Sequence, residues 1–189
     1  ADMRQMETQA EKEDKTGTSP LTFASFPYAA FATTYSANSP VTDSAAGGTA
    51  LATGVKTNNN SIGVDANREP VENIAEKAKK AVKKVGVATT VSIDHATPAS
   101  FYAHQKSRND YYEIGVELTQ SGFNFFGGGD FEENVKHDDK RAPELYKLAE
   151  KADYRLVRGY EQFQKNHRGN KIILIQGKDA AEKTIPYAI

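Results

Sequence analysis

Asp43 and Ser44 stand directly before a run of very small side chains at residues 45–48. The composition of residues 44–53 predicts a helix that ends at Gly54 and has Ser44 at its N-terminus. Free N–H groups and the positive end of the helix dipole converge at that end, and they favour a phosphate on the serine oxygen. The alternative, which stays open here, is that one of the two residues is only a helix N-cap.

A second group of polar side chains follows the most apolar segment of the chain, residues 85–93. Asp94, His95 and Thr97 come just past the carboxyl end of this predicted strand. Ligands of open α/β sheets bind outside the carboxyl ends of the strands, and these side chains could serve a hard divalent ion directly or through water. The alternative is a helix cap, with Thr97 as N-cap and Pro98 at the first helical position.

Arg108 is the third candidate, and it lies in a polar run. A guanidinium group is a planar fork that can clamp two phosphate oxygens. A lone arginine in such a run can equally be a solvated charge, so this side chain alone does not indicate a function.

The elements that must position these residues alternate between strands and helices. Period-2 patterns and apolar runs predict strands over 28–35, 85–93, 123–126, 154–157 and 171–176. Amphipathic or polar helical patterns are found at 1–16, 44–53, 71–83, 110–121, 142–152 and 159–167. This alternation predicts an α/β fold with a mostly parallel sheet sandwiched by helices, which residues 1–189 form as one partial domain.

Composition narrows the classes of function. The net charge is -1, so there is no basic field to attract nucleic acid or an anionic membrane. No stretch approaches the roughly 20 apolar residues of a membrane-spanning helix, and no signal peptide is recognised. The chain has no cysteine, which excludes disulfides, thiolate zinc sites and a cysteine nucleophile.

Taken together, the three groups resemble the alkaline phosphatase family. Asp43-Ser44 and the small residues after it are similar to that family's nucleophile signature, and LATGVKT at 51–57 continues the likeness. His-Ala-Thr-Pro-Ala at 95–99 looks like its magnesium-side motif, and Arg108 falls at its phosphate-binding arginine. The resemblance is sharpest over residues 41–112, and three ordered motifs are more specific than any one of them.

The resemblance implies a role for each matched residue. Ser44 would be the nucleophile that forms a phosphoserine and a ligand of the activating metal, Asp43 would orient Arg108, and Arg108 would hold the phosphate oxygens. Thr97 would be a magnesium ligand, and His95 would hold the same ion less directly, through water. Asp94 matches no ligand of the family. The implied cofactors are two zinc ions and magnesium, and the implied substrates are small phosphate monoesters in the periplasm or outside the cell.

The chain also departs from the family. No Asp-Gly metal loop precedes residue 1, and nothing matches the zinc ligands of the family's C-terminal half, so the chain resembles roughly the middle portion of the enzyme. His104, His137 and His167 do not replace those ligands. We expect the isolated chain to bind zinc weakly or not at all and to have little activity. We also expect a homodimer or other self-association, because a missing strand would leave an apolar sheet edge.

Two other functions remain open. Relatives on the same core cleave sulfate esters or phosphodiesters, although Asp43-Ser44 with Arg108 favours a monoesterase. The chain could also be a non-catalytic α/β fragment that only binds anions at the helix start of Ser44.

Overall fold

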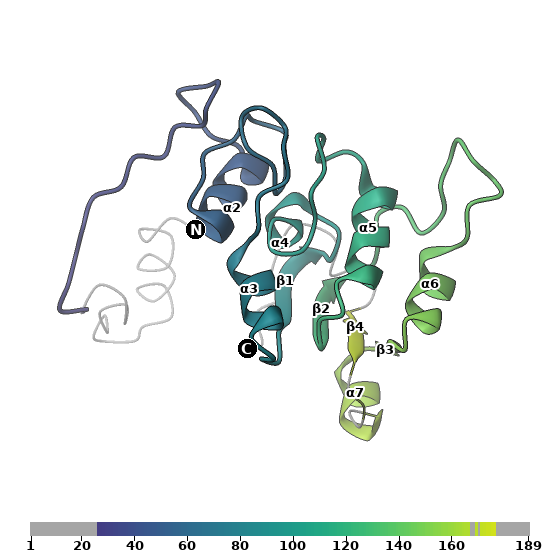
Figure 1. Ribbon diagram of the computed structural model, residues 1–189. Coiled ribbons are helices and arrows are strands. Elements are labelled where there is room, and N and C mark those ends of the chain that lie inside the picture. The colour runs from purple at the N-terminus through teal and green to yellow at the C-terminus, as the bar shows by residue number, and fades with distance from the viewer. Residues whose placement is uncertain (1–25, 167–168, 170, 177–189) are drawn as a thin grey trace, which may run out of the picture. The chain divides into compact units, whose positions relative to one another are not determined.

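The computed structural model describes residues 26–166, 169 and 171–176 (Figure 1). The chain divides into two units, Ala1–Thr33 and Thr34–Ile189. The helix predicted at the start of the chain, residues 1–16, lies outside the described residues.

Residues 26–35 form neither helix nor strand. Tyr28 is 91% exposed and Phe31 fully exposed, so these two aromatic side chains are not part of the core. The strand predicted over residues 28–35 is therefore wrong. A sequence pattern yields a strand only where another strand supplies backbone partners and a surface to pack on.

The second unit contains a four-stranded sheet in the order β1-β2-β4-β3, with every pair parallel. The strands are β1 (Gly86–Ser92), β2 (Phe125–Gly129), β3 (Arg155–Arg158) and β4 (Ile172–Ile175). Their carboxyl ends therefore lie along one edge of the sheet, where open α/β folds bind ligands. The parallel sheet with helices confirms the α/β class predicted from the sequence.

The helices are α2 (Ser44–Thr53), α3 (Ile74–Lys80), α4 (Ala96–Ala99), α5 (Tyr111–Gln120), α6 (Leu145–Lys151) and α7 (Tyr160–Asn166). α2 ends at Gly54 with φ of 77°, as predicted. α3 is shorter than the predicted 71–83, because Asn73 caps it in a reciprocal capping box with Glu76. At its other end Val82 is 92% exposed and has φ of 60°, so it does not belong to the apolar face.

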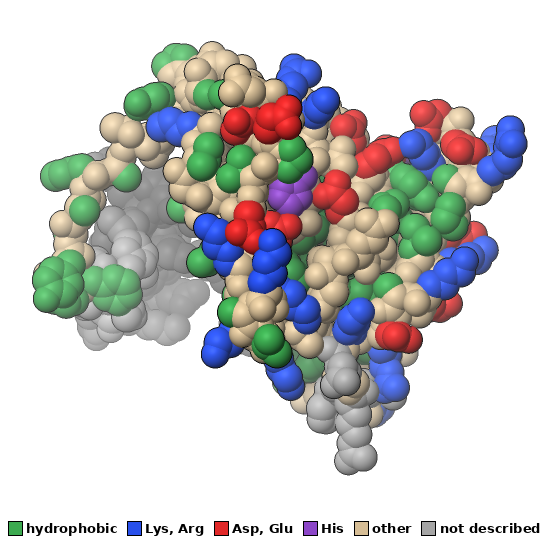
Figure 2. Space-filling model, viewed as in Figure 1, with side chains coloured by type: hydrophobic (Ala, Val, Ile, Leu, Met, Phe, Trp, Pro, Cys, Tyr) green, Lys and Arg blue, Asp and Glu red, His purple; other side chains and the backbone are tan. Residues whose placement is uncertain are grey.

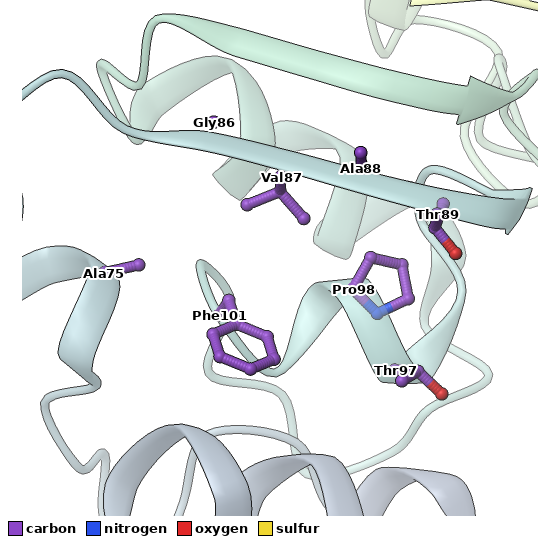
Figure 3. Close-up of a pocket in the computed structure, with 8 residues that line it drawn as sticks. All are labelled: Ala75, Gly86, Val87, Ala88, Thr89, Thr97, Pro98 and Phe101. Carbon is purple, nitrogen blue, oxygen red and sulfur yellow. The ribbon is translucent and has the colours of Figure 1, made fainter. Parts of the chain in front are cut away.

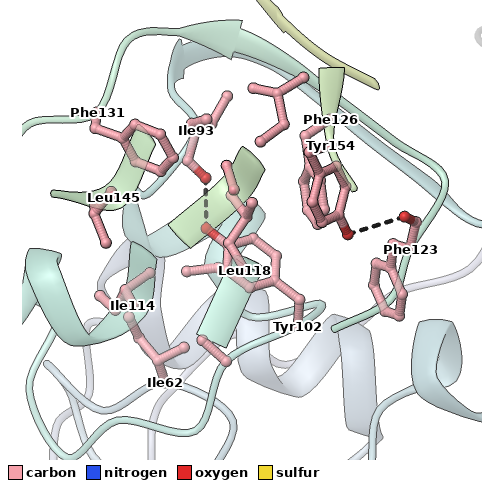
Figure 4. Packing of buried hydrophobic residues seen from close by; sticks show 14 of the residues in the cluster. Ile62, Ile93, Tyr102, Ile114, Leu118, Phe123, Phe126, Phe131, Leu145 and Tyr154 are labelled. Atoms are coloured by element: carbon pink, nitrogen blue, oxygen red, sulfur yellow. Dashed lines mark hydrogen bonds between the residues drawn. The ribbon is translucent and has the colours of Figure 1, made fainter. Parts of the chain in front are cut away.

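The two faces of the sheet carry separate clusters of apolar side chains. Phe126, Ile173 and Ile175 are fully buried and pack in the larger cluster, with residues of α4, α5 and α6 (Figure 4). The opposite face packs against Phe163 of α7 and contributes Phe125, Val157, Ile172 and Leu174. Helices thus cover both faces, although on the second face the described residues supply only α7.

Two buried tyrosines tie the larger cluster to the backbone. The hydroxyl of Tyr102 donates a 2.5 Å hydrogen bond to the carbonyl of Ile93, and that of Tyr154 donates a 2.9 Å bond to Phe123 (Figure 4). The bond from Tyr102 holds Ile93, which follows β1 and directly precedes Asp94 and His95. The core therefore fixes the backbone just before these two candidate residues.

β1 departs from its prediction in one respect. Residues 85–93 do form a parallel strand, but the strand lies at an edge of the sheet, and its first six residues are exposed or half-buried. The prediction of a buried strand is wrong because the position of a strand in the sheet order is not visible in its composition. β1 pairs with β2 on one side and has no partner on the other among the described residues.

The small residues of α2 serve helix packing. A Cβ placed on Gly48 would lie 2.6 Å from Oγ of Ser100 and 3.5 Å from the carbonyl oxygen of Thr97. Ala45 is fully buried, and its carbonyl oxygen lies 3.4 Å from Oγ of Ser100. Close approach between α2 and α4 therefore brings the Ser44 helix beside the segment that carries His95.

No helix in the described part of the chain is long and apolar enough to cross a membrane. Figure 2 shows acidic and basic side chains interspersed over the visible face, in keeping with the net charge of -1.

Candidate active site

Asp43 is the N-cap of α2 and Ser44 is its first residue. The Asp43 carboxylate accepts a 2.9 Å hydrogen bond from the amide of Ala46, which satisfies one of the free donors of the helix start. Ser44 is exposed, and among the described residues its hydroxyl has no hydrogen-bond partner. The N-cap alternative is therefore correct for Asp43, while Ser44 presents a free hydroxyl at the positive end of the helix.

Arg108 reaches Asp43 across 65 residues of sequence. Its Nη1 donates to Oδ2 of Asp43 at 3.3 Å, and its Nη2 lies 3.2 Å from Nε2 of His95. The side chains of Arg108 and Asp43 are 23% and 25% exposed. The fold thus brings three of the predicted site residues together, beside the helix start that carries Ser44.

His95 is held neutral in this arrangement. Burial lowers its pKa, and the positive charge of Arg108 lowers it further. A neutral imidazole that accepts from Arg108 at Nε2 carries its proton on Nδ1. Nδ1 is buried and has no partner among the described residues, so it is a donor still to be satisfied.

Asp94 is fully buried next to His95. Its Oδ2 accepts a 2.8 Å hydrogen bond from the amide of Glu132, which joins the segment after β1 to the segment after β2. Oδ1 has no partner among the described residues. Burial raises the pKa of this carboxyl to about 7, and the hydrogen bond from the Glu132 amide offsets only part of that effect.

Thr97 takes no part in the contacts of Arg108 with Asp43 and His95. It is exposed and lines a groove of about 260 Å³ between α3, α4 and β1, together with Pro98 and Phe101 (Figure 3). α4 begins at Ala96 with His95 as its N-cap residue, so Thr97 is not the cap and Pro98 is not the first helical residue. No contact between the described residues joins the Thr97 hydroxyl to Asp43, His95 or Arg108.

The loop at residues 58–60, three consecutive asparagines, contributes contacts that the sequence did not predict. Asn59 accepts the amide of Asp43 at 3.2 Å and donates to the carbonyl of Val41 at 2.9 Å. The amide of Asn60 donates to Oδ2 of Asp43 at 3.0 Å. Asparagines in sequence are a signal for such a role, because their side chains bond to backbone and tolerate left-handed conformations.

The other end of the Arg108 loop is anchored on α5. Glu117 accepts a 2.6 Å hydrogen bond from the amide of His104 and a further bond from the side chain of Gln105. The His104 ring lies between two carboxylates, with Nδ1 3.8 Å from Glu117 and Nε2 3.6 Å from Glu76. His104 therefore links α3 and α5 just before the segment that carries Arg108.

We expect the stability contribution of His104 to depend on pH. The bond to Glu117 raises its pKa in the folded state, so protonation is favoured by folding. This stabilisation is complete below the unfolded value near 6.5 and is lost as the pH rises through the folded pKa. Relative to wild type, His104→Gln should lose roughly 1 kcal/mol at pH 6 and less at pH 8, measured by urea unfolding at both values. His137→Gln is the control, and an equal loss at both values for His104→Gln would contradict the prediction.

The described residues contain no group of three or more His, Cys, Asp or Glu side chains that could hold a metal ion. His95 has the most suitable chemistry for a metal ligand, because its surroundings favour the neutral imidazole. Its Nε2, however, faces the Arg108 guanidinium. The described residues therefore do not fit a pair of zinc ions.

Comparisons with known proteins agree with the motifs. A family model described as alkaline phosphatase matches residues 1–124. Alkaline phosphatase 4 of Bacillus subtilis is 54% identical over 74 residues, which are 39% of this chain and 16% of that protein. The solved alkaline phosphatase of the Antarctic bacterium TAB5 has a TM-score of 0.76 at 32% identity, over 91% of this chain and 50% of that one.

A variant of the TAB5 enzyme, in which a histidine is replaced by aspartate and Mg is bound in the M3 site, matches with a TM-score of 0.76 and 29% identity. The matched region covers 92% of this chain and 49% of that variant. The chain thus spans about half the length of these solved enzymes and a smaller share of the curated relative. Because the family model covers 124 of the 189 residues and the Asp43, His95 and Arg108 side chains meet in the fold, the chain belongs to the alkaline phosphatase family.

Proposed function

We propose that the protein hydrolyses phosphate monoesters through a phosphoserine on Ser44. The observation that carries this is the Arg108 guanidinium, held between Asp43 and His95 beside the exposed Ser44 hydroxyl. Planar donors and a helix N-terminus at one place favour the three equatorial oxygens of a transferring phosphoryl group.

In the proposed reaction the Ser44 oxygen bonds to phosphorus as the bond to the leaving alcohol oxygen breaks. The serine proton passes to solvent, and the alcohol oxygen takes a proton from water. Water then attacks phosphorus and loses a proton to solvent as the bond from phosphorus to the Ser44 oxygen breaks. The Ser44 oxygen takes a proton from solvent, and inorganic phosphate leaves. Arg108 holds the non-bridging oxygens in both steps, and Asp43 keeps its guanidinium in place.

We also propose that the protein uses a metal cofactor. Magnesium in the TAB5 variant and membership of the family support a metal cofactor, with His95, Thr97 and Ser44 as the candidate ligands on this chain. A bound metal would lower the pKa of the serine hydroxyl, which is a poor nucleophile by itself. The described residues do not provide the ligands of two zinc ions.

The test is phosphoryl transfer to Ser44. The protein is incubated with excess zinc, magnesium and an aryl phosphate, quenched in acid, and examined by mass spectrometry beside Ser44→Ala and the control Ser39→Ala. We expect a phosphoryl group on Ser44, none in Ser44→Ala, and substoichiometric zinc with slow turnover. Stoichiometric zinc with fast turnover would show that the ligand set is larger than proposed. Faster cleavage of a sulfate ester or phosphodiester would favour the related hydrolases, and a chain that gains no phosphoryl group would contradict the proposal.

The absence of a metal-binding group among the described residues favours a second candidate, a fragment that only binds anions. Phosphate titration in zinc and in chelator separates the two. Equal affinity in both, without phosphoryl transfer, would support the anion-binding function.

We also propose that the chain self-associates through β1, as a homodimer or a larger species. β1 has one free edge among the described residues, and Val87 and Val91 are only half-buried. An open strand edge beside apolar surface pairs with another chain. Light scattering should show a mass that rises with concentration, and Thr90→Lys should reduce the association. A constant monomer mass would contradict it.

The domain organisation, the location and the substrates are proposed from membership of the alkaline phosphatase family. Residues 1–189 form part of one alkaline-phosphatase-like domain, and the protein acts in the periplasm or outside the cell on small phosphate monoesters. The interspersed surface charges support a protein without a nucleic-acid or membrane partner (Figure 2).

A further inference from the structure

Asn60 contacts both members of the Asp43–Arg108 pair through its backbone. Its amide N–H donates to Oδ2 of Asp43 at 3.0 Å, and its carbonyl oxygen accepts the amide of Arg108 at 2.7 Å. Its side-chain Nδ2 lies 3.3 Å from Oγ of Ser107. One exposed residue thus sits between the acid that orients the guanidinium and the backbone from which the guanidinium projects.

The backbone of Asn60 makes this possible. Its φ is 75°, in the left-handed region that residues other than glycine and asparagine adopt only at a cost. The two residues after Asn60 extend the same connection, since Ser61 Oγ donates to the carbonyl of Lys106 at 3.2 Å and the amide of Ile62 donates to that of Gln105 at 2.9 Å. These bonds hold the two loops together. The left-handed turn at Asn60 points its N–H toward the Asp43 carboxylate and its C=O toward the Arg108 amide.

We propose that Asn60 is a positioning residue for the phosphate-binding arginine, and that it acts through its left-handed backbone rather than its side chain. The proposal rests on the proposed function of Arg108 as the phosphate clamp. A residue that avoids positive φ either relaxes the peptide or destabilises the loop. In both cases the hydrogen bond to Asp43 and the backbone of Arg108 shift together, and the guanidinium loses its fixed direction.

The test compares Asn60→Ala with Asn60→Gly. Both remove the side-chain contact to Ser107, but only glycine adopts positive φ freely. We expect Asn60→Ala to weaken binding of inorganic phosphate about five- to tenfold, and Asn60→Gly to recover most of that loss. In an Asp43→Ala background the difference between the two should shrink, because only the bond from the Arg108 amide to the Asn60 carbonyl then depends on the left-handed turn.

Asp153 supplies a matched control. It also has a positive φ, 63°, but it precedes β3 at the amino end of the sheet, away from the site. Asp153→Ala and Asp153→Gly should differ in stability in the same sense as the Asn60 variants while leaving phosphate affinity unchanged. A change of phosphate affinity in Asp153→Ala equal to that in Asn60→Ala would show that general destabilisation is the cause, and would overturn the inference.

A second measurement separates this inference from the proposed function. NMR relaxation of the Arg108 Nε–H group reports how well the guanidinium is ordered without any ligand. We expect the order parameter to fall in Asn60→Ala and to recover in Asn60→Gly, even if the chain neither binds nor transfers phosphate. An order parameter that is unchanged in both variants, or lowered equally in both, would overturn the inference.

Discussion

Replacing Arg108 by alanine should weaken binding of inorganic phosphate about 10- to 100-fold, measured by calorimetric titration. Hydrogen bonds to charged groups contribute about 1.5–3 kcal/mol, and tenfold in affinity corresponds to about 1.4 kcal/mol. The guanidinium is fixed by Asp43 at 3.3 Å and by His95 at 3.2 Å, so little ordering remains to be done when phosphate binds.

Arg108→Lys is the matched control for this prediction. Lysine retains the charge but not the planar fork, and its ammonium group cannot contact Asp43 and His95 in the same geometry. We expect an intermediate affinity, closer to the alanine variant than to wild type. If lysine restored full affinity, charge alone would explain phosphate binding, and the fork geometry would be irrelevant. An alanine variant with wild-type affinity would place the phosphate elsewhere.

The second large effect concerns the core. Phe126→Ala should lower the free energy of unfolding by about 3–5 kcal/mol, measured by urea denaturation followed by circular dichroism. Phe126 is fully buried at the centre of the aromatic cluster, with ring centroids 5.3 Å from Tyr102 and 5.9 Å from Phe123. Its removal leaves a cavity between the rings of Tyr102, Phe123 and Tyr154, which these rings cannot fill without leaving their own contacts.

Phe125→Ala tests the same chemistry on the other face of the sheet. Phe125 is only half-buried and packs with Phe163 in the smaller cluster, so its loss should be clearly smaller. Equal losses for the two neighbours would mean that the two faces contribute similarly to stability. Phosphate affinity should fall in Phe126→Ala in proportion to the unfolded fraction, because the rings that Phe126 contacts, those of Tyr102, Phe123 and Tyr154, do not belong to candidate site residues.

Local sequence signals predicted most elements of the sheet and their helices. Gly54 ends α2 as predicted, and Gly122 follows the C-cap residue of α5; both have positive φ, 77° and 66°. The apolar run of β4 is a buried strand, with every residue from Ile172 to Ile175 buried. These features depend on residues close in sequence, such as the apolar period, the capping residues and a glycine at a left-handed position.

Strand order and pairing were not predictable in the same way. β1 has the composition of a central strand but lies at the sheet edge, and residues 28–35 have the pattern of a strand but no partner among the described residues. Both errors have one cause. A strand is defined by its neighbours, which come from distant parts of the chain, and β-propensity describes only how well a segment fits once they are present.

By itself the sequence singled out the candidate site residues: Asp43 and Ser44 before a small-residue helix, His95 and Thr97 after a strand, and Arg108 in a polar loop. Only the tertiary structure decided which of them meet. It joined Arg108 to Asp43 and His95, turned Thr97 toward a groove, and placed Asn60 between the two loops. The reason is physical, because composition and spacing report local conformation, whereas contact across 65 residues depends on how helices and strands pack.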